Sequence, residues 1–298
     1  MIRLGLCCIF KDQPIRFRRT TAKYLGRFDR EDQLARLADI ISHNATSLSH
    51  ALAYCADNGI QAFRINSQIL PLKTHSVMGY RMDDLPGSRA ILEQFRACGQ
   101  FAATRNIRLS FHPDQFVLLS SPTSRVTLHS VNELIYQAEV AKWVGADVIN
   151  IHGGGMYGDK TGALGRLEEE ILALPGHIRS LLTLENDDRI YTPADLLPVC
   201  TRTGIPLVYD VHHHRVNPDG MSIEAATSAA VTTWNREPLF HISSPINGWQ
   251  GNDTRKHHDY IDPDDFPPCW RNLDITVDVE AKAKELAVLR LKDDLGSA

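Results

Sequence analysis

The sequence predicts an α/β protein with a (β/α)8 TIM-barrel fold, formed by one domain over residues 1–298. Two observations lead to this prediction. Short apolar runs alternate with longer segments of helical periodicity along the chain. Six of these runs also lead directly into a histidine or a carboxylate residue. Parallel strands of a barrel bring their C-terminal ends to one rim, so we expect these side chains to meet there in a polynuclear metal site.

The predicted strands are short and rich in Ile, Val, Leu and Phe, which is typical of parallel strands buried on both faces. They are Ile2–Cys8, Ala62–Asn66, Ile107–Phe111, Val148–His152, Leu181–Glu185, Leu207–Asp210, Leu239–Ile242 and Ile275–Glu280. The predicted helices are Gln33–Asn58, Ser88–Asn106, Ser124–Val144, Leu164–Leu172, Pro193–Thr203, Ser222–Trp234 and Ala281–Leu289. The stretch Ser243–Pro268 is long and polar without a clear helix. Long loops at this rim of a barrel usually carry function.

The composition is that of a globular protein, with 43% hydrophobic and 23% charged residues. No apolar stretch approaches the roughly 20 residues that cross a bilayer, and the first residues do not resemble a secretion signal. The six cysteines are scattered and form no C-x-x-C pair. We therefore expect a reduced, cytoplasmic protein that does not use a membrane.

The net charge of -4 gives no general indication of nucleic-acid binding. Charge is uneven, however, because the segment Lys11–Arg30 holds seven lysines and arginines against two aspartates. A basic loop after the first strand, including Arg18 and Arg19, is suited to holding phosphates. A solvated loop without a partner accounts for the same charges equally well.

The strand-end residues have the chemistry of metal ligands, since imidazole nitrogens and carboxylate oxygens bind Zn²⁺ and Mn²⁺. They are His112, His152, Glu185, Asp210, His241 and Glu280. A single histidine at a strand end is more often a hydrogen-bonded framework residue. Six ionisable groups at equivalent positions are harder to explain by packing, because burying them together is costly without a cation. Glu185, in mid-sequence, is placed to bridge two ions.

Further polar residues are expected at the same rim. His213 follows Asp210 by three residues, and His257 and His258 lie in the long seventh loop. Lys282 follows Glu280 by two residues, where it would either pair with a phosphate or cap the last helix.

Gln115 and Phe116 follow the third strand and would project from its loop. Exposed aromatic residues stack on bases or wedge between them. The alternative is that Phe116 packs beneath its own loop.

In order and spacing, these segments resemble the ultraviolet damage endonucleases, metal-dependent DNA repair nucleases built on a barrel like that of endonuclease IV. The resemblance covers nearly the whole chain. The matching motifs are Arg3–Gly5, Cys7–Cys8, Asn44 with Leu48, Phe63–Ser67, Leu70–His75, His112–Gln115, Asn150–Gly154, Leu184–Asn186, Asp210–His213, His241–Ser243, His257–Ile261 and Asp278–Lys282.

The resemblance implies a monomer that binds damaged double-stranded DNA and cuts it immediately 5′ to the damaged base, leaving a 3′-hydroxyl and a 5′-phosphate. It implies three divalent ions, with Mn²⁺ expected and Zn²⁺ or Mg²⁺ as alternatives. His112, His152 and Glu185 would hold the first ion. The second would be held by Glu185, Asp210, His241 and Glu280, and the third by His213 and His257. The catalytic residues would be Glu185, His241, Glu280 and Lys282.

Gln115 and Phe116 match the family's Gln-aromatic pair that takes the place of the lesion bases. The other expected DNA contacts are Arg18, Arg19, Lys73 and His75. Two positions depart from the family pattern. Leu6 stands where a tyrosine is expected, and Leu239 stands where a lysine that helps bridge metals is expected, which bears on the third ion.

Three other functions remain open from the sequence. One is a metal-dependent sugar isomerase or epimerase of the xylose isomerase type, which gathers similar ligands but needs no basic loop and no Gln-Phe pair. Another is an abasic-site endonuclease with the same metal site. The last is a lesion-binding barrel that has lost catalysis.

Overall fold

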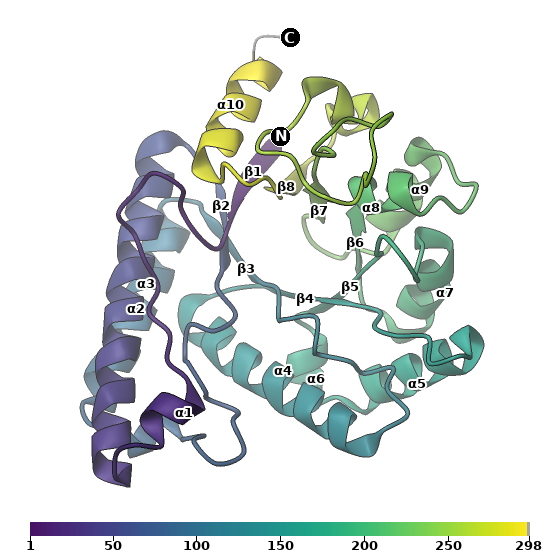
Figure 1. The fold of residues 1–298 in the computed structure, drawn as a ribbon. Helices are drawn as coiled ribbons and strands as arrows, with labels where there is room; N and C mark the ends of the chain where they lie inside the picture. Colours follow the sequence, from purple (N-terminus) through teal and green to yellow (C-terminus); the bar gives the residue numbers. More distant parts are fainter. Residues whose placement is uncertain (297–298) are drawn as a thin grey trace.

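Eight parallel strands close into a barrel in chain order, which confirms the predicted fold class (Figure 1). This computed structural model describes residues 1–296. The strands are β1 (Ile2–Cys7), β2 (Ala62–Ile65), β3 (Arg108–Phe111), β4 (Val148–His152), β5 (Leu182–Glu185), β6 (Leu207–Asp210), β7 (Leu239–Ile242) and β8 (Ile275–Val279). Pairing of β8 with β1 closes the barrel.

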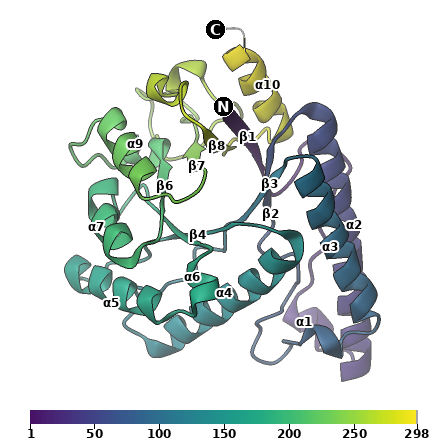
Figure 2. The same cartoon turned by 180° about the vertical axis from the view of Figure 1, so that it is seen from behind.

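Helices surround the barrel on its outside (Figures 1 and 2). The longer ones are α2 (Arg30–Asn58), α3 (Ser88–Thr104), α4 (Ser124–Val144), α5 (Lys160–Ala173), α7 (Pro193–Thr203), α9 (Ile223–Thr232) and α10 (Glu285–Gly296). The shorter elements are α1 (Ala22–Leu25), α6 (Gly176–Arg179), α8 (Val211–Val216) and the 3-10 turns η1 (Met82–Asp84), η2 (Pro263–Asp265) and η3 (Pro268–Trp270). Within residues 1–296, no helix has the length and apolar character needed to cross a membrane.

The predicted start of the last helix at Ala281 is wrong. Lys284 has a left-handed backbone (φ 53°), which an α-helix does not tolerate, so α10 begins only at Glu285. The buried Glu285 carboxylate accepts backbone N–H groups of Lys11 and Asp12 at 2.7 and 2.8 Å. These bonds fix the segment after β1 against the start of α10.

The two faces of the strands differ, because successive side chains point to opposite sides. Outward residues such as Phe63, Phe240 and the fully buried Leu6 join the large apolar core under the helices. The inward face is largely polar near the site, whereas the sequence predicted apolar burial on both faces. Leu239 belongs to a small separate cluster with Val148 and Val208. These three share the strand face of His241, His152 and Asp210, so they form an apolar layer beneath the rim.

Candidate metal centre

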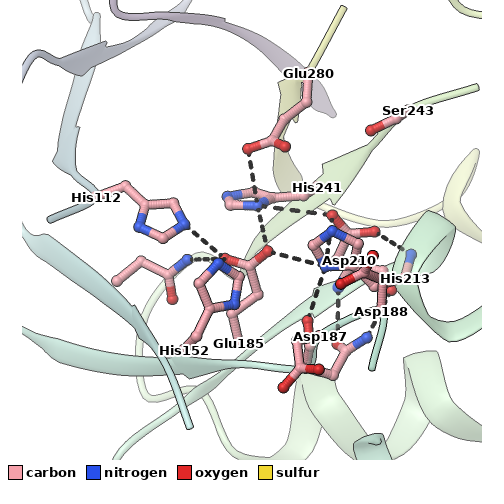
Figure 3. Close-up of polar contacts among 12 residues, drawn as sticks. His112, His152, Glu185, Asp187, Asp188, Asp210, His213, His241, Ser243 and Glu280 are labelled. Carbon is pink, nitrogen blue, oxygen red and sulfur yellow. Dashed lines mark hydrogen bonds and ion pairs between the residues drawn. The ribbon is translucent and has the colours of Figure 1, made fainter. Parts of the chain in front are cut away.

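The six strand-end residues converge at the C-terminal rim of the barrel (Figure 3). Strand register sets their order, since His152 lies beside Glu185 and Asp210 lies beside His241 in neighbouring strands. His112 and Glu280 directly follow β3 and β8. The convergence predicted from the sequence is therefore present.

The potential ligands form three overlapping groups, and within each group the ligand atoms lie within 4.8 Å of one another. The groups are His112 with His152 and Glu185, Glu185 with Asp210 and His213, and Asp210 with His241 and Glu280. Two carboxylates, Glu185 and Asp210, belong to two groups each. A chain of groups joined by shared carboxylates could hold neighbouring divalent cations.

Glu185 is the centre of this arrangement and is almost fully buried. Its Oε2 lies 3.0 Å from His112 Nε2 and 4.0 Å from His152 Nε2. Its Oε1 lies 3.1 Å from His241 Nδ1 and 3.4 Å from His213 Nδ1. One carboxylate thus faces four imidazoles, which suits a bridging ligand.

Several buried polar atoms of the centre have no hydrogen-bond partner among the described residues. They include Glu185 Oε1, Asp210 Oδ2 and the Nδ1 atom of His241. Buried groups left unpaired are costly, so native proteins rarely leave several together. Cations between these atoms would satisfy them, and the donor set therefore fits the metals implied by the sequence.

The positive groups of the centre lower the pKa values of its carboxyl groups. Burial disfavours ionised Glu185, but the surrounding imidazoles, led by His241, hold its pKa well below the usual range. Burial also disfavours ionised Glu280, whereas Arg64 and then His241 hold the pKa of that carboxyl low. Both carboxylates are therefore anionic at neutral pH and ready to bind cations.

Two imidazoles carry the opposite shift. Burial works against their charge, yet Asp210 and Glu185 raise the pKa of His213 to about 9, and Glu185 raises the pKa of His241 to about 9. Burial lowers the pKa of His152 from its ordinary value of 6.5. In the metal-free protein at neutral pH, His213 and His241 are therefore protonated and His152 is neutral.

These shifts predict how the stability of the metal-free protein depends on pH. The pKa values of His213 and His241 rise from 6.5 to about 9 on folding. Their stabilising contribution is therefore complete below pH 6.5 and lost as pH rises through 9. Unfolding temperatures measured in chelator from pH 6 to 10 should fall over that interval. With saturating Mn²⁺ the fall should be smaller, because metal replaces the protons. A flat profile in chelator would contradict the predicted protonation.

Several supporting residues were not assigned a role from the sequence. Asn150 donates a hydrogen bond to Glu185 Oε2 and accepts one from Thr183 at 2.9 Å. The guanidinium of Arg64 pairs with Glu280 Oε1. Asn150 lies two residues before His152, on the same strand face. Counting back two residues from each rim residue is the signal that would have found it.

The seventh loop brings His257, and not His258, toward the centre. His257 Nδ1 lies 3.9 Å from Glu280 Oε2, and its ring centroid lies 6.5 Å from that of His213. The exposed His258 instead accepts the backbone N–H of Tyr260 at 3.0 Å. His213 itself lies with Glu185 and Asp210 in one of the three groups. Lys282 is exposed at the rim and stands outside these groups.

Gln115 and Phe116 project from the loop after β3. Both are exposed. The Phe116 residue is 72% exposed, so it does not pack beneath the loop. Phe116 borders a cavity of about 600 Å³, whose lining also includes Gln68, Lys73 and His75. An exposed aromatic ring beside an open cavity is available to contact a ligand.

The remaining DNA-contact candidates differ in how freely their side chains point outward. Arg19 is exposed, and Arg18 is exposed but pairs with Asp39 at 2.8 Å. Lys73 is mostly buried, and its Nζ donates to the Tyr80 carbonyl at 2.9 Å. His75 Nδ1 accepts two backbone N–H groups of the following turn at 3.2 and 3.1 Å. The hydrogen bonds of Lys73 and His75 therefore stabilise the loop that carries these residues.

Comparison with known proteins gives a consistent result across the chain. The family model described as UV-endonuclease UvdE matches residues 2–298. A UV DNA damage endonuclease of Bacillus velezensis is 35% identical over 292 residues, which cover 93% of this chain and 88% of that protein. Its counterpart from Bacillus cereus is 34% identical over 289 residues, with the same coverage.

The structural comparisons agree. The crystal structure of SacUVDE has a TM-score of 0.88 and 26% identity, covering 100% of this chain and 99% of its own. Endonuclease IV from Thermus thermophilus has a TM-score of 0.63 and 17% identity, covering 99% and 100%. D-psicose 3-epimerase from Clostridium cellulolyticum has a TM-score of 0.61 and 13% identity, covering 99% and 97%. At such low identity the last two show a shared fold alone.

Proposed function

Because this chain belongs to the UvdE family of UV endonucleases and is thus a DNA repair endonuclease, we propose that it incises the backbone immediately 5′ to UV photoproducts and other distorting lesions. The cut would depend on bound divalent metal and leave a 3′-hydroxyl and a 5′-phosphate. The observation that carries this proposal is the chain of three ligand groups joined by Glu185 and Asp210 at the rim. The protein would act as a monomer, since a duplex with one lesion is asymmetric. Its proposed location is the cytoplasm.

The ligand groups are proposed to hold three divalent ions, Mn²⁺ first among the candidates. When bound, such ions lower the pKa of water and neutralise charge on the scissile phosphate and the leaving 3′ oxygen. Glu185 would bridge, with His112 and His152 on one side and His241 and Glu280 on the other. Leu239 packs in an apolar cluster with Val148 and Val208, so this position offers no polar group to the centre. Retention of the third ion would then rest on His213 and His257.

Recognition of damage is proposed to use Gln115 and Phe116. Their exposure and the cavity of about 600 Å³ beside Phe116 support this role. A photoproduct stacks and pairs poorly, so extruding it costs less than extruding intact bases, by about a few kcal/mol. If the Phe116 ring filled the space left by the extruded bases, it would recover part of the base stacking that is lost there.

Phosphate contacts are proposed for Arg18, Arg19 and Lys282, which are all exposed. Lys73 and His75 would contribute mainly by holding the loop that lines the cavity, given their hydrogen bonds within it. The phosphate contacts should make the affinity for DNA fall as the salt concentration rises.

The number of bound ions provides a test that is independent of DNA. His257→Ala is expected to reduce the bound Mn²⁺ from three ions per chain to two, because His257 lies beside Glu280 and faces the centre. His258→Ala is the matched control, since that neighbouring imidazole is exposed and bonded to its own loop. Elemental analysis after gel filtration measures the count. Loss of an ion from the control, or three ions retained in His257→Ala, would count against the assignment.

The proposed chemistry is tested by the ends of the cut strand. A DNA polymerase should extend the upstream fragment directly, because metal-assisted hydrolysis of the bond between phosphorus and the 3′ oxygen leaves a 3′-hydroxyl. If extension required prior phosphatase treatment, the 3′-hydroxyl assignment would be wrong. A ligase-competent 5′-phosphate on the downstream fragment is the second expected end.

A further inference from the structure

Asp278 is a fully buried carboxylate in the inner face of β8, two residues before Glu280. Neither of its carboxylate oxygens has a hydrogen-bond partner among the described residues. The guanidinium of Arg64 lies nearby, with its Nη1 4.0 Å from Asp278 Oδ2, but this group pairs more closely with Glu280. A buried carboxylate kept without a hydrogen bond calls for an explanation.

The neighbouring strands show where this carboxylate points. In the sheet register, Asp278 lies between Gly5 of β1 and His241 of β7. A Cβ atom placed on Gly5 would overlap Asp278 Oδ1. The missing side chain of Gly5 therefore gives the carboxylate its space within the barrel.

His241 is the ligand candidate that Asp278 faces. One ring nitrogen, Nδ1, points to the centre, at 3.1 Å from Glu185 Oε1 and 3.5 Å from Glu280 Oε1. The other, Nε2, lies 3.7 Å from Asp278 Oδ2 and forms no hydrogen bond within residues 1–296. The imidazole is thus placed between the centre and the buried carboxylate.

We propose that Asp278 is a positioning residue that keeps the proton of His241 on Nε2, so that the Nδ1 lone pair faces the cation. An imidazole that binds metal commonly donates its other N–H to a carboxylate, which fixes both the tautomer and the ring orientation. A small side-chain movement closes the separation to a hydrogen bond. This inference rests on the proposed metal centre, and Gly5 takes part by leaving room for the carboxylate.

The first experiment measures metal binding without DNA. Asp278→Asn keeps the shape of the side chain but removes its charge, and should raise the dissociation constants for Mn²⁺ and Zn²⁺ by about 10–100-fold. Thr276→Val is the control, because Thr276 lies two residues earlier on the same strand face and contacts Arg108 and Glu237 instead. Equal affinities in Asp278→Asn and the wild type, or an equal loss in the control, would overturn the proposal.

The proton itself gives a second readout. In the Zn²⁺-loaded protein, the His241 Nε2–H should appear by NMR as a slowly exchanging proton, and it should exchange rapidly in Asp278→Asn. Detection of the metal on Nε2 would overturn the proposal. Both measurements stand apart from nicking of damaged DNA, so a protein that binds metal as expected but cuts no photoproduct would refute the proposed function alone.

Gly5 completes the test through a double-mutant cycle. Gly5→Ala should weaken metal binding, because the new methyl group displaces the Asp278 carboxylate. In an Asp278→Ala background that space is free, so adding Gly5→Ala should cause little further loss. If the two losses simply multiply, Gly5 does not act through Asp278.

Discussion

Glu185→Gln is expected to abolish incision while leaving binding to damaged DNA largely intact. The carboxylate faces four imidazoles and belongs to two of the three ligand groups, and a neutral amide cannot bridge cations in its place. Loss of a residue that only supports a metal ligand lowers metal affinity or activity by about 10–100-fold. Removal of the bridging ligand should therefore lower the incision rate by more than about 100-fold. Single-turnover incision rates and gel-shift assays measure the two properties separately.

Glu237→Gln is the matched control for this substitution. Glu237 precedes β7 at the opposite end of the barrel, where it pairs with Arg3 at 3.0 Å. The control should therefore keep its incision rate and its bound metal. A Glu185→Gln protein that cuts at the wild-type rate would show that Glu185 is not the bridging ligand.

Phe116→Ala should reduce discrimination between damaged and intact DNA more than it reduces the phosphate chemistry. The ring is 72% exposed and stands on a loop outside the ligand groups. Stacking of an aromatic side chain on a base contributes about 1–3 kcal/mol, so the ratio of affinities should fall by about 5–150-fold. Competition binding between lesion-containing and intact duplexes measures this ratio.

Phe116→Tyr provides the control, because it retains the aromatic ring and should preserve the discrimination ratio. The incision rate at saturating enzyme should change little in either variant. An unchanged ratio in Phe116→Ala would remove this residue from lesion recognition.

Much of the rim was predictable because strand ends and ligand chemistry coincide in the sequence. An apolar run followed by His152 or Glu185 defines both a strand and the end of it that faces the site. Closure of the barrel then brings residues from β3 and β8 together, although they are far apart in the sequence. Family resemblance added the DNA substrate, which the ligands alone could not indicate.

The inner face of the barrel was harder to predict. Asn150, Arg64 and Asp278 lie in runs that were interpreted as strands, but their partners come from other strands and depend on register. The break before α10 depends on the left-handed backbone at Lys284, which lysine rarely adopts and no sequence pattern signals. Tertiary contacts decide such details, whereas strand periodicity reports only which face a residue occupies.

The most direct test of the account is a nicking assay on a labelled duplex with one cyclobutane pyrimidine dimer, beside an undamaged duplex and one with an abasic site. Each is incubated with and without Mn²⁺. We expect a Mn²⁺-dependent cut immediately 5′ to the dimer and none in the undamaged duplex. A cut confined to the abasic duplex, or no cut in any duplex by protein shown to hold its metal, would contradict the proposed function.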